Sequence, residues 1–344
     1  MEALILAGGF GTRLKPLTYT RAKSLLPILN KPMIQHIIDI LPYEVNKVIL
    51  AVNYRKNQIE EYFNKNDCGK EIIINDEKTP LGTGGATKFA EKHISGKFLV
   101  LNSDIICSLK LNEMIKFHEK NKSIATISLW PVKNVSEFGV ADVQKNGRII
   151  GFVEKPKPED APSDLINAGA YLLEPLVLDY IEKGRLISME KEIFPKIIND
   201  TDKFYGFKFK GFWMDIGRIS SYLEVNRFLL NKKNLDYCKG INCKVNGILK
   251  KSTIGDNVVI GNKSNIEETI VFNNAKIEDN VILSNCVIGE NSKISYGSKL
   301  KYIVVGDNEK IKEKTILENN LIWTQPKPKE YPDKQIGNAV LNKK

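Results

Sequence analysis

The 344-residue sequence has few cysteines and no long apolar segment. Its five cysteines are scattered and include no Cys-x-x-Cys pair, which favours reduced thiols in a cytoplasmic protein over a disulfide framework or a zinc site. No apolar run is long enough to cross a bilayer, so we predict no membrane span. Glu2 is acidic and the apolar run after it is short, which argues against a signal peptide.

Histidine is also scarce, and the basic residues form no long block. The three histidines all precede residue 119 and have no ligand partner at metal spacing, so we expect structural or exposed side chains. The formal net charge of +10 comes from lysines that are mixed with Asp and Glu along the chain. This pattern argues against nucleic acid as a partner and suits small anionic substrates. Residues 325–344 form a basic Pro/Lys tail that we do not expect to pack in a core.

Two familiar phosphate-binding patterns are absent near the start of the chain. The dinucleotide fingerprint would need a third glycine where Leu14 stands, and no Gly-Lys-Ser/Thr tripeptide ends a P-loop. A short apolar strand nevertheless leads into Gly8, Gly9 and Gly11, whose backbone can turn sharply and present N–H groups to phosphate oxygens. Arg13 and Lys23 add positive charge beside this turn.

Apolar runs alternate with helix-like stretches from residue 1 to about 231. This order predicts an α/β domain with a Rossmann-like, mainly parallel mixed sheet and ligands at the carboxyl ends of its strands. Asp104 follows one fully apolar strand, and a buried carboxylate there requires a compensating cation. A helix cap is the alternative for Asp104.

From about 232 to 324 the sequence is repetitive. Aliphatic residues recur six positions apart in triplets, and the triplets recur every seventeen residues. The aliphatic positions are Ile254, Ile260, Ile266, Val271, Ile277, Leu283, Ile288, Ile294, Leu300, Val305, Ile311 and Leu317. Such hexapeptide repeats predict an all-β left-handed β-helix domain. Acyltransferases with this fold need a histidine base, which the repeats lack, so a stacking or capping role and a homo-oligomer formed through the β-helix are favoured.

The first segment also resembles a family signature. Gly8-Gly9-x-Gly11-Thr12-Arg13-Leu14-x-Pro16-Leu17-Thr18, followed by Lys23, resembles the sugar-1-phosphate nucleotidyltransferases, and further motifs resemble the mannose-1-phosphate guanylyltransferases among them. The resemblance implies an enzyme that joins a nucleoside triphosphate to a sugar 1-phosphate and releases pyrophosphate. Arg13 and Lys23 would be catalytic, on the leaving pyrophosphate and on the reacting phosphate. The implied nucleotide-binding residues are Leu6, Ala7, Gly8, Gly9, Gly11, Thr12, Gly82, Thr83 and Asn102.

The resemblance also implies which base is read. The segment Gly82-Thr83-Gly84-Gly85-Ala86 is similar to the family's base-reading loop, and glycine at Gly85 is typical of guanylyl-transferring members. Glutamine, expected there and at Ser24 in thymidylyl-transferring members, is absent. GTP and mannose 1-phosphate are therefore the favoured substrates. The alternatives are a glucose-1-phosphate nucleotidyltransferase using UTP, dTTP or ATP, and a catalytically idle subunit that senses nucleotide-sugar.

Five further motifs imply the sugar and metal sites. Phe138-Gly139-Val140, Val153-Glu154-Lys155-Pro156 and Asn167-Ala168-Gly169 resemble the family's sugar-phosphate motifs, which assigns Gly139, Glu154, Lys155 and Asn167 to the sugar phosphate. Apart from the resemblance, the sequence predicts that Glu154 and Lys155 form a solvent-exposed charged pair at the end of a strand. Leu101-Asn102-Ser103-Asp104 and Trp213-Met214-Asp215 resemble the metal-binding motifs, with Ser103 in place of the usual glycine. Asp104 and Asp215 would together hold Mg²⁺.

Overall fold

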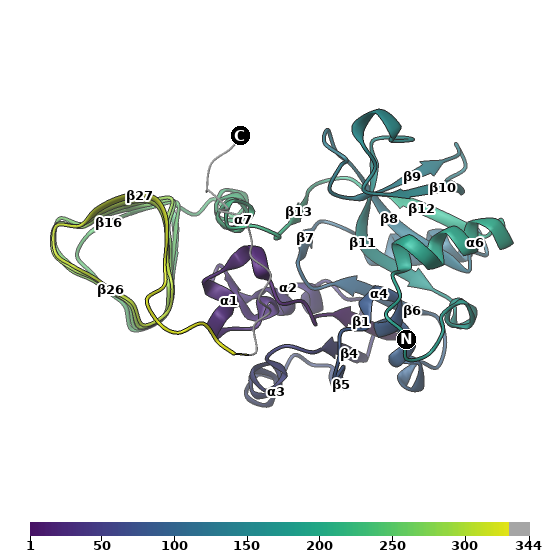
Figure 1. Cartoon of the computed structure of the whole chain (residues 1–344), viewed down its shortest axis with the longest axis horizontal. Coiled ribbons are helices and arrows are strands. Elements are labelled where there is room, and N and C mark those ends of the chain that lie inside the picture. Colours follow the sequence, from purple (N-terminus) through teal and green to yellow (C-terminus); the bar gives the residue numbers. More distant parts are fainter. Residues whose placement is uncertain (330–344) are drawn as a thin grey trace. The chain divides into compact units, whose positions relative to one another are not determined.

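The computed structural model describes residues 1–329 and divides into two compact units (Figure 1). Unit 1 comprises Met1–Gly9 and Ile34–Met214, and unit 2 comprises Phe10–Met33 and the chain from Asp215 onward. By its contacts, the segment with most of the glycine signature thus belongs with the C-terminal strands. The domain boundaries at 231 and 324 stay predictions, and residues 330–344 of the predicted basic tail lie outside the described residues.

Four parallel strands form the centre of unit 1. They are β1 (Glu2–Leu6), β4 (Lys47–Val52), β5 (Glu71–Asp76) and β6 (Phe98–Asn102). β1 lies between β6 and β4, and Leu4 is fully buried. Burial on both faces explains why β1, β4 and β6 are apolar runs rather than alternating patterns. The shared direction brings the ends of β1 and β6 to one edge, where Leu6 pairs in register with Asn102.

The sheet continues with strands of mixed direction, in the order β10-β9-β11-β6-β1-β4-β5. β11 is antiparallel to β6, and β12 is parallel to β8. The bounds are β8 (Ala125–Pro131), β9 (Gly139–Val143), β10 (Ile149–Glu154), β11 (Leu165–Leu173) and β12 (Phe204–Lys208). Two short pairs are β7 (Ile105–Cys107) with β13 (Trp213–Asp215), and β2 (Pro27–Ile28) with β3 (Lys31–Pro32). This mixed sheet confirms the predicted fold class of the first domain.

Helices α3, α4, α5 and α6 pack against β5, β1, β8 and β10 respectively. The helices are α1 (Leu17–Thr20), α2 (Met33–Asp39), α3 (Lys56–Lys65), α4 (Gly82–Phe89), α5 (Leu111–Lys120), α6 (Phe194–Asp200) and α7 (Ile219–Lys232). Within residues 1–329, no helix combines the length and apolarity that a membrane crossing requires.

The sequence predicts a base-reading loop over residues 82–86, and this is wrong, because α4 begins at Gly82. Glycine disfavours a helix, so a tertiary contact must stabilise this one. The carbonyl oxygen of Ile187 accepts from the amides of Gly84 (2.8 Å) and Gly85 (3.2 Å), which caps the first turn from outside the helix.

The C-terminal strands of unit 2 are all parallel and form three faces. The first face holds β14 (Tyr237–Lys239), β17 (Ser252–Ile254), β20 (Ile270–Val271) and β23 (Val287–Ile288). The second holds β15 (Lys244–Val245), β18 (Val259–Ile260), β21 (Lys276–Ile277), β24 (Lys293–Ile294) and β26 (Lys310–Ile311). The third holds β16 (Ile248–Lys250), β19 (Asn265–Glu267) and β22 (Ile282–Ser284), and β25 (Lys299–Val305) and β27 (Ile316–Ile322) extend from it to the first. Seen end-on, the faces enclose a triangle (Figure 1). This nearly closed arrangement is consistent with the predicted left-handed β-helix.

The seventeen-residue repeat places like residues one above another. Ile260 pairs with Ile277 and Ile277 with Ile294, and all three are fully buried in the core of the β-helix. At one corner an asparagine with positive φ recurs in each coil: Asn257, Asn274, Asn291 and Asn308. Asparagine tolerates this left-handed backbone better than most residues. The repeat therefore encodes both the core and its turns.

Candidate active site

The nucleotide-side residues of unit 1 lie where β1 and β6 end. Leu6 closes β1, Asn102 closes β6, and Ala7, Gly8 and Gly9 follow β1. The amide of Ala7 donates to the carbonyl oxygen of Ala51 (2.8 Å), and the amide of Ser103 donates to that of Leu6 (3.3 Å). Half-buried Asp104 comes next. The edge of the sheet thus gathers these residues of unit 1 as the sequence predicts.

Gly82 and Thr83, assigned to the nucleotide, form the first turn of α4. The Thr83 hydroxyl donates to Oε2 of Glu190 (2.7 Å) and accepts from the Met189 amide (2.9 Å). A Cβ at Gly85 would collide with the carbonyl oxygen of Arg185. Packing therefore explains the glycine at Gly85, and this glycine is no longer evidence that the base is guanine.

On the predicted sugar side, Gly139 of β9 lies opposite Glu154 of β10. A Cβ at Gly139 would collide with Cζ of Phe152 and lie 2.8 Å from Oε2 of Glu154, so packing against the Phe152 ring favours glycine here. Burial raises the pKa of Glu154, the carboxylate of Glu190 raises it further, and Lys155 opposes both. Protonated and ionised forms of Glu154 are thereby brought closer in energy.

Lys155 has a left-handed backbone, with φ of 52°. Its amide donates to the carbonyl oxygen of Phe138 (3.0 Å), and its Nζ lies 3.6 Å from Oε1 of Glu154. A non-glycine residue held at positive φ is a strained conformation of a kind that clusters at functional sites. The side chain is 60% exposed, so its ammonium group is available to an anion.

Asn167 of β11 belongs to a chain of hydrogen bonds. Its Oδ1 accepts from the Gly169 amide (3.0 Å), and its Nδ2 donates to the Tyr171 hydroxyl (2.9 Å). The Tyr171 hydroxyl in turn donates to Oε1 of Glu190 (3.1 Å). Burial is the largest cause that raises the pKa of Tyr171, so this group stays a neutral donor. Asn102 joins this cluster, because a Cβ at Gly169 would lie 2.7 Å from its Nδ2.

Sequence reasoning missed Glu190, which connects the two sides. Its carboxylate accepts from the hydroxyls of Thr83 on α4, Tyr171 on β11 and Ser188 (2.6 Å). It lies in a π-helical turn, Met189–Ile193, a rare geometry that often marks functional sites. No local signal identifies it, because its partners lie up to 107 residues away in the sequence.

Glu77 is a second missed carboxyl group. It follows β5, is only 6% exposed, and its Oε2 accepts from the amide of Leu81 (3.3 Å), the residue before α4. Burial raises its pKa to about 7, against that hydrogen bond. An acidic residue five positions before Gly82, where the predicted base-reading segment begins, is the sequence signal that could have identified it.

Unit 2 holds the remaining signature residues. Gly11 has φ of 64°, and a Cβ there would lie 2.7 Å from Cγ2 of Thr18 and 3.1 Å from Cβ of Lys23. Thr18 donates its hydroxyl to the carbonyl oxygen of Gly11 (3.0 Å). Thr12 begins a short 3₁₀ turn, Thr12–Leu14. The turn therefore brings Lys23 beside Gly11, as a glycine-lined cationic loop requires.

Arg13 and Asp215 both lie close to Gly217. A Cβ at Gly217 would lie 3.0 Å from Nη2 of Arg13 and 3.1 Å from Oδ2 of Asp215. Asp104 belongs to unit 1, so a metal site shared by Asp104 and Asp215 stays a prediction. Residues 1–329 contain no group of three or more His, Cys, Asp or Glu side chains arranged to hold a metal ion.

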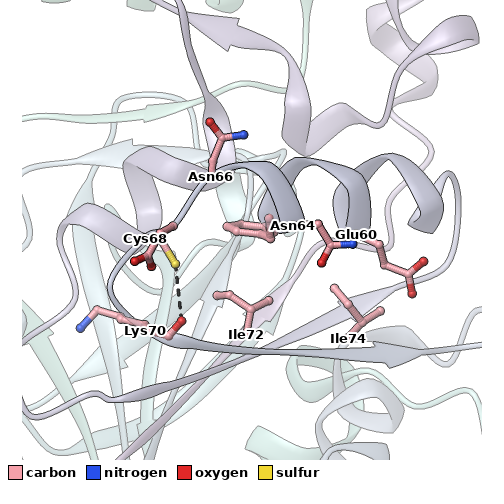
Figure 2. A pocket seen from close by; sticks show the side chains of 9 residues that line it. Glu60, Asn64, Asn66, Cys68, Lys70, Ile72 and Ile74 are labelled. Carbon is pink, nitrogen blue, oxygen red and sulfur yellow. Dashed lines mark hydrogen bonds between the residues drawn. The ribbon is translucent and has the colours of Figure 1, made fainter.

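A separate pocket of about 450 Å³ lies beside α3 and β5 (Figure 2). Glu60, Asn64, Lys70 and Ile72 are among its lining residues, and the Cys68 thiol donates to the carbonyl oxygen of Lys70 (3.8 Å). None of the predicted site residues lines it. This pocket is therefore not the predicted site.

Family models match almost the whole described chain. The nucleotidyl transferase model matches residues 2–232, and the GMPPB C-terminal domain model matches residues 241–336. A probable mannose-1-phosphate guanylyltransferase 2 of Arabidopsis thaliana is 43% identical over 242 residues, which cover 67% of this chain and 65% of that protein. A probable mannose-1-phosphate guanylyltransferase 3 of Oryza sativa subsp. japonica is 38% identical, with 83% and 80% covered. The chain belongs to the nucleotidyl transferase family.

Solved structures agree with this assignment. HddC from Yersinia pseudotuberculosis superposes with a TM-score of 0.56 at 29% identity, over 66% of this chain and 99% of that one. A UDP-glucose pyrophosphorylase complexed with UDP-glucose gives 0.59 at 25% identity, over 67% and 98%. The matched region covers about two thirds, 65%, of the first curated relatives. Within the family, the two curated relatives named above are described as probable mannose-1-phosphate guanylyltransferases.

Proposed function

We propose that this protein is an enzyme that transfers the guanylyl group of GTP to mannose 1-phosphate, forming GDP-mannose and pyrophosphate. The observation that carries the proposal is the cluster in unit 1, where Glu190 joins Thr83 on the nucleotide side to Tyr171 and Asn167 on the sugar side. A single carboxylate that bonds to both sides suits an enzyme that must hold two substrates together. Curated relatives about 40% identical are named for this activity.

Guanine is the base that best suits Glu77. The Watson–Crick edge of guanine presents two adjacent donors, N1–H and N2–H, and an ionised carboxylate can accept both. Adenine offers no such pair. A solved relative, HddC from Yersinia pseudotuberculosis, was crystallised with GMP-PN. We therefore assign the reading of the base to Glu77 and the start of α4, and the binding of the α-phosphate side to the turn after β1.

The sugar phosphate is assigned to the cluster around β9, β10 and β11. The exposed ammonium group of Lys155 would bind the phosphate, and Glu154 and Asn167 would accept and donate hydrogen bonds to sugar hydroxyls. Gly139 is assigned to the same site, next to Glu154 on the neighbouring strand. These roles are the ones that the family resemblance implies for the four residues.

The reaction is an in-line displacement. A phosphate oxygen of mannose 1-phosphate attacks the α-phosphorus of GTP, the bond from that phosphorus to the bridging oxygen breaks, and pyrophosphate leaves. The chain then has mainly to position two anions and neutralise charge. Lys23 would stabilise the reacting phosphate, and Arg13 the leaving pyrophosphate. Both are cations on the segment that starts at Gly11.

Mg²⁺ fits the donors that the chain offers. Asp104 and Asp215 would hold it, and a hard cation with one or two carboxylate ligands takes its remaining ligands from water and substrate phosphates. When bound, the ion would neutralise charge on the two substrates. A homo-oligomer through the β-helix and a cytoplasmic location stay predictions.

Pyrophosphate release tests the proposed function. The full chain is incubated with Mg²⁺, each of GTP, ATP, UTP and dTTP, and either mannose 1-phosphate or glucose 1-phosphate. We expect the highest kcat/KM for GTP with mannose 1-phosphate. A preference for glucose 1-phosphate would replace the assigned sugar, and no turnover with any pair, together with binding of GDP-mannose, would identify a sensing subunit.

A further inference from the structure

Within unit 2, Arg21 connects the segment Phe10–Met33, called the signature segment below, to the β-helix. Its Nη2 lies 2.5 Å from Oε2 of Glu290 and 3.4 Å from Oδ2 of Asp307. Its guanidinium carbon lies 4.6 Å from the centre of the Phe272 ring. These partners come from three successive coils of the β-helix, so one side chain of the segment contacts all three coils.

The contact is largely buried, so removing one partner costs more than breaking an ordinary surface ion pair. The Arg21 side chain is 15% exposed and that of Asp307 is 7% exposed. Asp307 also accepts from the hydroxyl of Thr20 (2.6 Å) and from the amide of Glu290 (2.7 Å). A charge with little access to water depends on its partners, and removal of one partner leaves the other unsatisfied. Loss of Arg21 would therefore leave the carboxylates of Glu290 and Asp307 without their cation.

Neighbouring contacts hold the rest of the segment against the same domain. The ring of Tyr19 lies 5.1 Å from that of Trp323. Further along, Nδ2 of Asn30 donates to the carbonyl oxygen of Ile254 (2.7 Å). The segment is thus bound to the β-helix on both sides of Lys23.

We propose that Arg21 is a positioning residue, through which the β-helix holds Arg13 and Lys23 in the geometry the reaction requires. Arg21 touches no substrate in this assignment and acts through the backbone of its segment. It lies two residues before Lys23 and eight after Arg13. The β-helix would thereby take part in catalysis without a catalytic group of its own. This inference rests on the proposed function, because Arg13 and Lys23 take their roles from it.

Arg227 provides a matched control. It lies on α7, and its Nη1 makes an ion pair of 2.6 Å with Oε2 of Glu268 on the same β-helix. The side chains are 33% and 23% exposed. Arg227 therefore anchors to the same domain through another element, one that carries neither Arg13 nor Lys23. If loss of any ion pair to the β-helix lowers kcat, substitution of Arg21 and of Arg227 should both lower it. If Arg21 positions Arg13 and Lys23, only substitution of Arg21 should lower kcat.

The experiment compares Arg21→Met, Arg21→Lys and Arg227→Met in the full chain. Small misplacements of positioned groups cost up to about 100-fold in rate, so we expect kcat of Arg21→Met to fall about 10- to 100-fold. KM of Arg21→Met for mannose 1-phosphate should equal that of the wild type, because the groups assigned to bind this substrate lie in unit 1. Arg21→Lys keeps the charge but not the planar fork, and should restore part of kcat. Arg227→Met should keep the kcat of the wild type.

Amide hydrogen exchange provides a readout that needs no activity. We expect faster exchange of the amides from Thr12 to Lys23 in Arg21→Met, and wild-type rates there in Arg227→Met. Equal kcat and equal exchange in the two variants would overturn the inference while the wild-type activity still stood. An inactive wild type would refute the proposed function instead, and exchange alone would then decide whether Arg21 orders the segment. If Arg21→Met does not fold, the double variant Glu290→Gln/Asp307→Asn takes its place, because it removes both acidic partners of Arg21. Wild-type kcat and exchange in it would overturn the inference.

Discussion

Glu77→Gln tests the buried carboxyl group beside α4. In the folded chain, burial raises the pKa of Glu77 from 4.5 to about 7. Between these values the folded state binds more protons than the unfolded state, so the free energy of unfolding falls as pH rises. The stabilisation is complete below pH 4.5 and is lost above about pH 7. A shift of this size corresponds to about 3 kcal/mol at most, since one pKa unit is about 1.4 kcal/mol.

The assay is urea denaturation of wild type and Glu77→Gln between pH 4.5 and 8. The variant should gain stability relative to wild type as pH rises, by up to about 3 kcal/mol over that range. Glu61→Gln is the control, because an exposed hydrogen bond to Lys65 lowers the pKa of Glu61. Its titration lies below pH 4.5, so it should cause no trend above pH 5. A difference between Glu77→Gln and wild type that does not change with pH would refute the reasoning from burial.

The same variant tests the reading of guanine. Hydrogen bonds to charged groups contribute about 1.5–3 kcal/mol each, so loss of one should raise KM for GTP about 10- to 100-fold. KM for ATP should change little, since adenine lacks the paired donors. In the wild type, KM for GTP should fall as pH rises through 7, because only the ionised carboxylate accepts both donors. An unchanged KM for GTP in Glu77→Gln would remove Glu77 from the base site.

Three further predictions concern other parts of the chain. Asp104→Asn should lose most pyrophosphate release while its circular dichroism and thermal unfolding match wild type, and unchanged turnover would exclude Asp104 as a metal ligand. Lys155→Ala should raise KM for mannose 1-phosphate with KM for GTP preserved, because its exposed ammonium group is assigned to the sugar phosphate, and a normal KM would remove it from that site. Ile277→Ala should destabilise the β-helix by about 2–5 kcal/mol in urea denaturation, because Ile277 is fully buried in the β-helix core. Ile282→Ala, at a side chain that is 41% exposed, is its control, and equal losses would contradict the packing assigned to the core.

Local pattern was sufficient for the architecture. The apolar runs of β1, β4 and β6 indicated a parallel sheet because strands buried on both faces need apolar residues at every position. The seventeen-residue repeat indicated the β-helix because each coil must present the same inward positions to its neighbours. In both cases the burial that the fold requires can be recognised from neighbouring residues in the sequence.

The helix α4 shows where local pattern failed. Four residues of glycine and threonine, Gly82–Gly85, favour a loop, and the carbonyl oxygen of Ile187 supplies the hydrogen bonds that make them helical. Packing against Arg185 explains why Gly85 is a glycine, so we assign base recognition to the buried Glu77 instead. Ile187 and Arg185 both lie far from Gly82–Gly85 in the sequence.

The sequence by itself determined the two folds and the motif residues, since hydrophobic period and glycine spacing are properties of neighbouring residues. Only the tertiary structure decided that Glu190 receives hydroxyls from α4 and β11, and that Arg21 pairs with a glutamate 269 positions away. Hydrogen bonds and ion pairs act over a few ångströms in space and leave no periodic trace in a single sequence. They therefore become visible only when folding has brought distant segments together.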